Sequence, residues 1–528
     1  MTLEQQTLPA VLRAAAAGHP DREAIVDGRT RLTHRDLLER VRTTAAALVA
    51  LGVEKGDRVC VWAPNSWQWE VMALAVTYSG GVLVPLNTRY TGHEALDVVV
   101  RSRARVAMVA DGFLGRQQHT QLVEAAEQAG FTLPTVVLLP YDGSSVPTGG
   151  GAVSWDELDR LAADVPTAVV EQRADDVRPD DVADILFTSG TSGRSKGARS
   201  AHRQVVAAAR AWSACGEVTA SDRYLIVNPY FHSFGYKAGI VVSLLAGATV
   251  VPQAVFEVGE MFRLVEQERI SILPGAPTIY QVMLEATDRD RHDLSSLRLA
   301  VTGAATVPVA LVRRMQSEMG FDSVLTAYGL TEAVVATMCR PGDDDTRVAT
   351  TCGRAAEGVE VRVAAPGSNT PLPAGTEGEV LLRGPNVMLG YLDDPEATAE
   401  AIDAHGWLHT GDVGRLDADG YLRITDRIKD LFIVGGFNVY PAEVEQVLAS
   451  LDGVVESAVV GVPDERLGEV GHAFVVRRAG SALDEQHVLA HARERLANFK
   501  VPRGVTFTDD LPRNAAGKVL KRELRSNR

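Results

Sequence analysis

Hydrophobic and polar positions show two patterns along the first part of the chain, a helical spacing and short apolar runs. Residues 37–51 carry apolar side chains at helical spacing and stop before Gly52, a residue typical of helix C-termini. Residues 69–78 fit a second helix. Short apolar runs that fit buried strands stand at 58–63, 82–85, 106–110 and 185–188. Strands that alternate with helices in this way predict an α/β fold with a mainly parallel sheet covered by helices.

The last part of the chain, about 100 residues long, is large enough to be a small domain. A polar stretch at 426–430 precedes it, so we expect two domains, at 1–428 and 429–528. Its pattern predicts helices at 441–451 and 483–496 and strands at 456–462 and 472–477. This mixture indicates a small α+β C-terminal domain.

Length and charge narrow the class of protein. A chain of 528 residues is too long for one ordinary core, which agrees with two domains. Apolar residues make up 46% and charged residues 23%, as in a soluble globular protein, and the formal net charge is −15. Such a surface repels nucleic acid and anionic lipid, so neither is an expected partner. The sequence leaves the oligomeric state open.

We find no signal for export or for insertion into a membrane. Residues 1–20 lack a charged start followed by an apolar run, and the most apolar stretches, 71–86 and 240–252, contain glycine and are too short to cross a bilayer. The four cysteines stand far apart, without a CxxC pair or a Cys/His cluster, which argues against disulfides and zinc. We therefore expect a soluble protein of the reducing cytoplasm.

The most informative segment is TSGTSGRSKG at 188–197, directly after the apolar run 185–187. Its glycines let the backbone turn sharply, its serines and threonines offer hydroxyl donors, and Lys196 adds a positive charge. A strand that ends in such a loop suits the phosphates of a nucleotide. A Ser/Gly linker is the plainer explanation, but linkers seldom follow a buried strand so closely. The missing GK[ST] excludes a P-loop NTPase.

With this loop, the sequence resembles the adenylate-forming (ANL) superfamily, which holds acyl-CoA synthetases, firefly luciferases and adenylation domains of peptide synthetases. The usual loop is TSGTTGxPKG; here Ser192 and Ser195 replace a threonine and the proline. Further similar stretches follow in the superfamily's order: TGAA at 302–305, YGLTE at 328–332, TGD at 410–412, DRIKD at 426–430, GGFN at 435–438 and PRNAAGK at 512–518. Each is short, but all of them in one order are hard to obtain by chance.

The resemblance implies a site for ATP and Mg²⁺. Its phosphate loop consists of Thr188, Ser189, Gly190, Thr191, Ser192, Gly193 and Lys196. The other implied nucleotide contacts are Gly303, Ala304 and Ala305 beside adenine and acid, Tyr328 and Gly329 at the adenine, Thr331 at the α-phosphate, and Asp412 and Arg427 at the ribose. Thr191 and Glu332 are the implied Mg²⁺ ligands, since oxygen ligands suit this hard cation.

The resemblance also implies a reaction in two steps. The carboxylate of an acid attacks the α-phosphorus of ATP with the help of Lys518, giving acyl-AMP and pyrophosphate. The thiol of coenzyme A then displaces AMP. Between the steps the small, mobile C-terminal domain rotates about Lys429 and brings the loop of Gly435, Gly436 and Phe437 to the thiol. The implied protein is an acid–thiol ligase with a large N-terminal adenylating domain.

Residues 228–235 (NPYFHSFG) are similar to the segment that lines the acid channel in the superfamily, which implies a site role for His232. A structural histidine is the plainer alternative. No aspartate lies between 228 and 239 to pair an amino group, so the acid is expected to have an uncharged body. Lys237 is an unusual charge for a fatty-acid channel, and it either meets a keto group of the substrate or faces solvent.

Four stretches, at 231–240, 273–280, 299–307 and 423–445, resemble one branch of the superfamily. This branch holds the actinobacterial acyl-CoA synthetases for the indane-propionate (HIP) left by steroid-ring degradation in sterol catabolism. The run AVVA at 333–336 departs from a more polar, glycine-containing run, so a medium- or long-chain fatty acid remains the alternative substrate. A luciferase-like oxygenase and an inactive binding module are rival classes, which oxygen dependence and pyrophosphate release would separate from a ligase.

Overall fold

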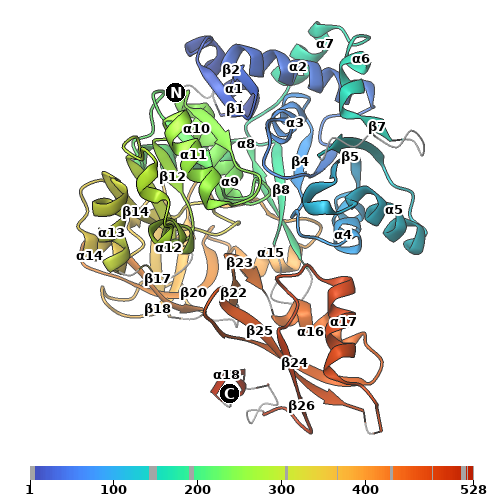
Figure 1. Cartoon of the computed structure of the whole chain (residues 1–528), viewed down its shortest axis with the longest axis vertical. Coiled ribbons are helices and arrows are strands. Elements are labelled where there is room, and N and C mark those ends of the chain that lie inside the picture. Colours follow the sequence, from blue (N-terminus) through green and yellow to red (C-terminus); the bar gives the residue numbers. More distant parts are fainter. Residues whose placement is uncertain are drawn as a thin grey trace.

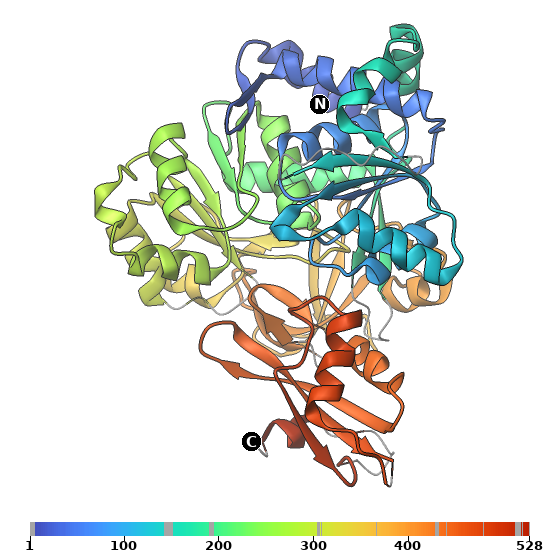
Figure 2. The same ribbon diagram turned by 45° about the vertical axis from the view of Figure 1, so that its right-hand side comes forward.

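The computed structural model describes two parts of unequal size, drawn one above the other in Figure 1. The described residues are 6–141, 152–188, 195–303, 307, 309–365, 367–427, 432–439, 441–478, 480–512, 519 and 521–526. The larger part surrounds its sheets with helices, and the smaller part, in orange and red, lies below it with the C-terminus (Figures 1 and 2). Within these ranges, none of the helices has the length and apolar character that crossing a bilayer requires.

The eight-stranded sheet contains the strands predicted nearest the N-terminus. Its order is β19-β9-β8-β4-β3-β5-β6-β7. Its strands are β3 (Arg58–Trp62), β4 (Val82–Pro85), β5 (Ala104–Asp111), β6 (Thr135–Pro140), β7 (Val153–Ser154), β8 (Val182–Thr188), β9 (Lys196–Ala201) and β19 (Gly390–Tyr391). All neighbours from β8 to β7 are parallel, and only β9 and β19 are added antiparallel. The predicted parallel sheet and its strands are confirmed, with shifts of a few residues at the ends.

The nine-stranded sheet, in order β16-β15-β14-β13-β12-β10-β11-β1-β2, is parallel from β14 to β1 and antiparallel at both edges. Its strands are β1 (Glu23–Asp27), β2 (Thr30–Thr33), β10 (Arg223–Ile226), β11 (Thr249–Pro252), β12 (Ile272–Pro274), β13 (Leu299–Gly303), β14 (Ser323–Tyr328), β15 (Thr337–Met338) and β16 (Arg354–Ala355). Carboxyl ends of parallel strands share one edge, so Gly303 and Tyr328 end neighbouring strands at the same side.

The helices of the larger part cover these sheets. They are α1 (Leu8–Gly18), α2 (His34–Ala50), α3 (Trp67–Tyr78), α4 (Gly92–Ser102), α5 (Gln118–Ala129), α6 (Leu158–Ala162), α7 (Thr167–Asp175), α8 (His202–Cys215), α9 (Ser233–Gly235), the π-helical η4 (Tyr236–Val241), α10 (Val242–Ala246), α11 (Val258–Glu268), α12 (Pro277–Glu285), α13 (Val309–Met319), α14 (Asp345–Thr350), α15 (Pro395–Ala401) and the 3₁₀ turns η2 (Phe113–Gly115), η3 (Trp155–Glu157) and η5 (Arg289–Arg291). Helix α2 begins three residues before the predicted start because Thr33 and Asp36 form a capping box there.

A small antiparallel sheet ends the larger part: β17 (Glu360–Ala364), β18 (Gly378–Arg383), β20 (Leu408–Leu416) and β21 (Leu422–Arg427). The C-terminal domain has a five-stranded sheet of β22 (Phe432–Val434), β23 (Phe437–Val439), β24 (Val454–Asp464), β25 (Gly468–Arg477) and β26 (Gly504–Thr508), with α16 (Pro441–Ala449), α17 (Glu485–Arg495) and α18 (Lys521–Ser526). It has its own apolar core, which confirms the predicted α+β domain.

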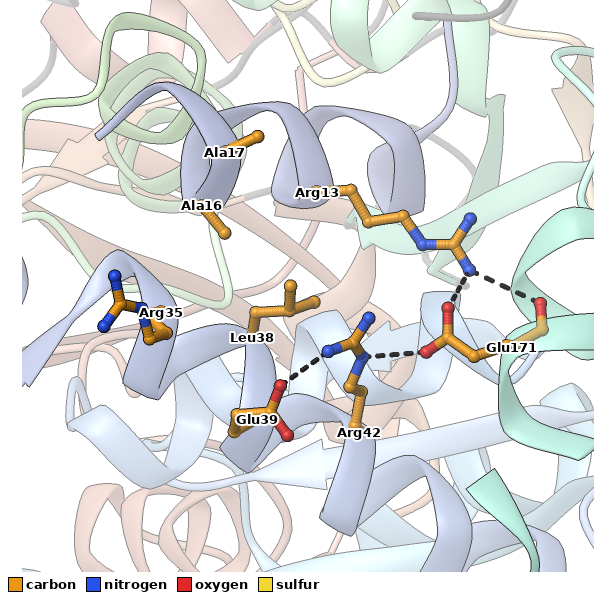
Figure 3. Close-up of a pocket in the computed structure, with 8 residues that line it drawn as sticks. All are labelled: Arg13, Ala16, Ala17, Arg35, Leu38, Glu39, Arg42 and Glu171. Carbon is orange, nitrogen blue, oxygen red and sulfur yellow. Dashed lines mark hydrogen bonds and ion pairs between the residues drawn. The ribbon is translucent and has the colours of Figure 1, made fainter. Parts of the chain in front are cut away.

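A carboxylate of α7 joins three N-terminal helices at the depression shown in Figure 3. Glu171 Oε2 lies 2.6 Å from an Arg13 guanidinium nitrogen, and its Oε1 lies 2.7 Å from Arg42 Nε. The Tyr78 hydroxyl donates to Glu171 Oε1 at 2.9 Å. All three ion-pairing side chains are partly buried, so the network cross-links α1, α2, α3 and α7.

We expect Glu171→Ala to lower the free energy of unfolding by about 1–3 kcal/mol, because two guanidinium groups and a hydroxyl lose their shared acceptor. Chemical denaturation would measure the loss. Glu39→Ala is the matched control: Glu39 pairs with the same Arg42 at 2.5 Å but is largely exposed, so its loss is expected to stay within about 1 kcal/mol. Equal losses in the two variants would contradict a special role of Glu171.

Candidate active site

Near the carboxyl ends of the strands lie four of the predicted site residues, in two groups. Lys196 and Glu332 both contact Tyr391, and Tyr328 contacts Asp412. The Tyr391 hydroxyl donates to Glu332 Oε1 at 2.8 Å, and Lys196 Nζ lies 5.0 Å from the centroid of the Tyr391 ring. The Tyr328 hydroxyl donates to Asp412 Oδ2 at 2.6 Å. The structure therefore brings the phosphate-loop lysine to the implied Mg²⁺ ligand, and the implied adenine contact to the implied ribose contact.

The charge of Glu332 depends on its neighbours. Burial raises the pKa of this carboxyl, and the hydrogen bond from Tyr391 opposes the rise. The nearby Asp412 carboxylate also raises that pKa, while Lys196 lowers it. Glu332 thus lies in a low-dielectric environment in which an additional cation would be strongly favoured. Thr331, next to it in the chain, is partly buried.

The turn after β14 is shaped by close backbone contacts. A Cβ on Gly329 would lie 1.7 Å from the carbonyl oxygen of Val334, so only glycine fits at this position. Val334 itself has a φ of 57°, in the left-handed region that disfavours β-branched side chains. Asn386 Nδ2 donates to the carbonyl oxygens of Ala333 and Val335, both at 2.7 Å. The run 333–336 keeps a tight turn although it lacks the glycine expected there.

The two predicted ribose contacts lie opposite each other on neighbouring strands. Asp412 of β20 and Arg427 of β21 are paired in the antiparallel register. Asp412 is buried, and its backbone N–H donates to Thr410 Oγ1 at 3.1 Å. The pairing explains how residues from separate motifs reach the same place.

Other predicted residues are placed at strand ends, and several lie outside the described residues. Thr188 ends β8, and its hydroxyl lies 3.4 Å from the carbonyl oxygen of Lys196. Gly303 ends β13, where a Cβ would lie 2.6 Å from the carbonyl oxygen of Ala327. Outside the described residues are Ser189, Gly190, Thr191, Ser192, Gly193, Ala304, Ala305, Lys429, Lys518 and the side chain of Arg427.

His232 is exposed and also has a structural contact. Its Nδ1 accepts a hydrogen bond from the backbone N–H of Phe234 at 3.2 Å and so caps the short helix α9. The ring nitrogen Nε2 then carries the hydrogen of the neutral imidazole. Because Nδ1 already accepts this backbone hydrogen bond, the neutral form of the ring is favoured near pH 7. The two roles suggested by the sequence, site residue and structural histidine, are compatible here.

Both sequence-based interpretations of Lys237 are wrong. Its side chain is fully buried, with Nζ 2.8 Å from Asp184 Oδ1 and 2.8 Å from Ser200 Oγ. Lys237 neither faces solvent nor is free to meet a substrate keto group, because η4 turns it toward the β8–β9 hairpin. Asp184 is the partner, and burial raises the pKa of this carboxyl despite the ion pair.

The predicted thiol loop belongs to the C-terminal domain. Gly435 and Gly436 form the turn between β22 and β23 with φ angles of 55° and 87°. Gly435 N donates to the Leu467 carbonyl oxygen at 2.9 Å, and Phe437 stacks on Phe499 with ring centroids 4.6 Å apart. In Figure 1 this hairpin lies on the side of the domain that faces the larger part.

Tyr391 is a functional candidate that the sequence did not suggest. It lies on β19, a two-residue edge strand paired antiparallel with β9, outside the motifs. Its hydroxyl orients Glu332 and its ring faces Lys196. A single tyrosine after a glycine gives no signal of its own, and only the pairing of β19 with β9 brings it to the site.

A two-domain α/β fold with Lys196 beside a partly buried glutamate at the strand ends is the arrangement expected of an adenylate-forming enzyme. The chain belongs to the AMP-binding enzyme family: residues 12–392 match the AMP-binding enzyme domain and residues 443–518 match its C-terminal domain. The predicted superfamily and fold are confirmed.

Among its relatives are 3-[(3aS,4S,7aS)-7a-methyl-1,5-dioxo-octahydro-1H-inden-4-yl]propanoyl:CoA ligases. The one from Rhodococcus jostii (strain RHA1) is 56% identical over 528 residues, all of both chains, and the one from Mycobacterium tuberculosis (strain ATCC 25618 / H37Rv) is 55% identical over 99% of both chains.

Two solved structures are similar over nearly the whole chain. A double mutant of o-succinylbenzoate CoA synthetase (MenE) from Bacillus subtilis, bound with its product analogue OSB-NCoA, has a TM-score of 0.83 and 27% identity, with 98% of each chain covered. ATP-bound MatB from Rhodopseudomonas palustris has a TM-score of 0.69 and 33% identity, covering 99% of this chain and 98% of its own.

Proposed function

We propose that this protein is an AMP-forming acyl-CoA ligase that converts a steroid-derived indane-propionate, ATP and coenzyme A into the acyl-CoA, AMP and pyrophosphate. The observation that carries the proposal is the 56% identity, over all of both chains, to the Rhodococcus jostii indane-propanoyl:CoA ligase. The buried Lys237 is consistent with an acid site that offers no free cation at this position, because its ammonium is paired with Asp184. We place the reaction in the cytoplasm, in keeping with four free cysteines.

In the first half-reaction we assign nucleotide binding to the residues around β14 and β20. The flat ring of Tyr328 packs on the face of the adenine, and Asp412 binds the ribose hydroxyls. Lys196 and the loop 189–193 hold the β- and γ-phosphates, and Thr331 and Lys518 stabilise charge that develops at the α-phosphate. His232 borders the acid carboxylate, to which a neutral imidazole N–H can donate.

The donors present fit a magnesium ion. Glu332 offers a carboxylate oxygen in a partly buried place with Lys196 nearby, and Thr191 offers a hydroxyl. Hard oxygen ligands of this kind, few in number, are usual where Mg²⁺ is shared between a protein and nucleotide phosphates. Mg²⁺ would neutralise charge on the phosphates when bound. The role of Tyr391 is then to orient the Glu332 carboxylate through its 2.8 Å hydrogen bond.

In the second half-reaction the thiol of coenzyme A attacks the acyl carbon, the acyl–phosphate bond breaks and AMP leaves. We assign the thiol path to Gly435, Gly436 and Phe437, and the change of domain position to a hinge at Lys429, with the domains meeting between 428 and 429. The two glycines have no side chains, so the loop has a bare backbone surface along which a thiol-bearing chain can pass, and their positive φ angles are ones that glycine adopts readily.

The test is a comparison of acids with purified protein, Mg-ATP and coenzyme A, with acyl-CoA and AMP read by mass spectrometry. The panel holds the bicyclic indane-propionate, straight-chain acids of several lengths, an aryl acid and an amino acid. We expect the indane-propionate to be turned over at least tenfold more efficiently than the others, about 1.4 kcal/mol of discrimination. Preference for straight chains would refute the substrate but not the ligase, and failure of every acid in the panel to give AMP would refute both.

A further inference from the structure

One lysine joins the two domains at a buried position. Lys500, in the segment between α17 and β26, is 4% exposed, although it belongs to a residue type that is rarely buried. Its Nζ lies 2.6 Å from Glu443 Oε1 in the same domain and 3.1 Å from Glu94 Oε1 in the larger domain. The ring of Tyr90, also in the larger domain, has its centroid 4.9 Å from the same Nζ.

The charge at this position depends on both domains. Burial disfavours the ammonium, but the carboxylates of Glu443 and Glu94 more than compensate and raise the pKa of Lys500 above its usual value. If the domains separate, Lys500 loses Glu94 and Tyr90, keeps Glu443 and the ring of Phe499, and becomes open to water. The ion pair with Glu94 and the cation–π contact with Tyr90 exist only when the domains meet as seen here, so they favour this arrangement.

The contacts around Lys500 extend to the predicted thiol loop. The neighbouring Phe499 stacks on Phe437, which follows the two glycines of that loop. Glu443 lies in the first turn of α16, which follows β23 directly along the chain. One ring contact and one short helix therefore connect Lys500 to residues 435–437.

The arrangement of the two domains resembles one that has been captured with a CoA product analogue. Over nearly the same share of the chain, the structure is more similar to that complex, at a TM-score of 0.83, than to MatB with ATP, at 0.69, or without it, at 0.68. Sequence identity runs the other way, at 27% and 33%. The difference between the TM-scores of 0.83 and 0.69 is slightly smaller than the fraction of the chain that belongs to the C-terminal domain. A difference of this size is expected if mainly the position of that domain differs between the two solved structures.

We propose that Lys500 is a positioning residue for thioester formation: with Glu94 and Tyr90 it fastens the C-terminal domain to the larger domain in the arrangement that serves the attack of coenzyme A. The inference rests on the proposed function, because it needs two half-reactions that can be measured separately. It assigns no contact between Lys500 and substrate.

Glu94→Gln is the sharpest test, because it removes the charge and keeps the local structure. Glu94 Oε2 accepts hydrogen bonds from Thr91 N and Oγ1, closing the capping box of α4, and glutamine serves equally well at that position. We expect thioester formation from supplied acyl-AMP to slow by about tenfold, a coupling typical of residues in contact. Acyl-AMP formation, measured by ATP–pyrophosphate exchange, is expected to stay within about twofold of the wild type.

Two further variants make the result specific. Lys500→Met is expected to show the same split between half-reactions, and adding Glu94→Gln to it is expected to change thioester formation no further, because the pair is already lost. Glu157→Gln is the matched control: Glu157 closes another capping box, with Ser154, on an exposed turn of the larger domain. This control is expected to leave both half-reactions unchanged.

The outcomes separate the inference from the function. Wild-type rates in both half-reactions of Glu94→Gln, or equal losses in both, would overturn the role of Lys500 and leave the ligase intact. Additive effects of Glu94→Gln and Lys500→Met would also overturn it, since the two residues would then act independently. Wild-type protein that makes neither acyl-AMP nor acyl-CoA from any acid would overturn the proposed function, and the role of Lys500 with it.

Discussion

Replacing Glu332 with glutamine is expected to slow acyl-adenylate formation by about 10²–10³-fold, the usual cost of removing one electrostatic contact to the transition state. The carboxylate is held by Tyr391 beside Lys196, in surroundings that raise its pKa mainly by burial. An amide of the same shape keeps the hydrogen bond from Tyr391 and loses the charge. ATP–pyrophosphate exchange over a range of Mg²⁺ concentrations would measure both the slower rate and a weaker response to the metal.

Tyr391→Phe is the companion variant, because it keeps the carboxylate and the aromatic face toward Lys196 and removes the orienting hydroxyl. We expect a smaller loss in exchange rate, about tenfold, in line with one hydrogen bond to a charged group. Thioester formation from supplied acyl-AMP should change less than exchange in both variants. An unchanged exchange rate and Mg²⁺ response in Glu332→Gln would refute the metal-ligand role.

The elements and the order of motifs could be predicted from the sequence because they depend on local chemistry. Apolar runs of strand length and helical periods gave β3, β4 and α3 nearly to the residue. Gly329 illustrates the same point at the site. A Cβ at this position would collide with the backbone, so the turn requires glycine, and this glycine can be recognised in the YGLTE stretch.

What could not be predicted depends on contacts between distant segments. Lys237 was assigned to solvent or substrate because a lone lysine among aromatic residues carries no sign of its partner, and Asp184 precedes it by more than fifty residues. Tyr391 and Lys500 were missed for the same reason, since their partners Glu332 and Glu94 become neighbours only when strands pair or domains meet. Buried polar pairs are specified by the fold rather than by local sequence.

The pair of Lys237 and Asp184 gives the largest expected loss of stability. Both side chains are fully buried, so Lys237→Met leaves an unpaired carboxylate and Asp184→Asn an unpaired ammonium, each expected to cost about 3–5 kcal/mol in the free energy of unfolding. Replacing both residues removes both charges, and we expect the double variant to lose less than the sum of the two single ones. Chemical denaturation of the four proteins would measure this coupling, and additive losses would contradict it.

The variant Lys237→Met should also respond to pH. Burial already raises the pKa of the Asp184 carboxyl in the folded protein, and without Lys237 this pKa lies further above its unfolded value. The loss of stability relative to wild type is therefore smallest at acidic pH and grows as pH rises through the folded pKa. Unfolding measured against wild type at matched pH would reveal this slope. A loss that does not change with pH would mean that the two side chains are not an ion pair in the folded protein, and the link between the β8–β9 hairpin and η4 would have to depend on packing alone.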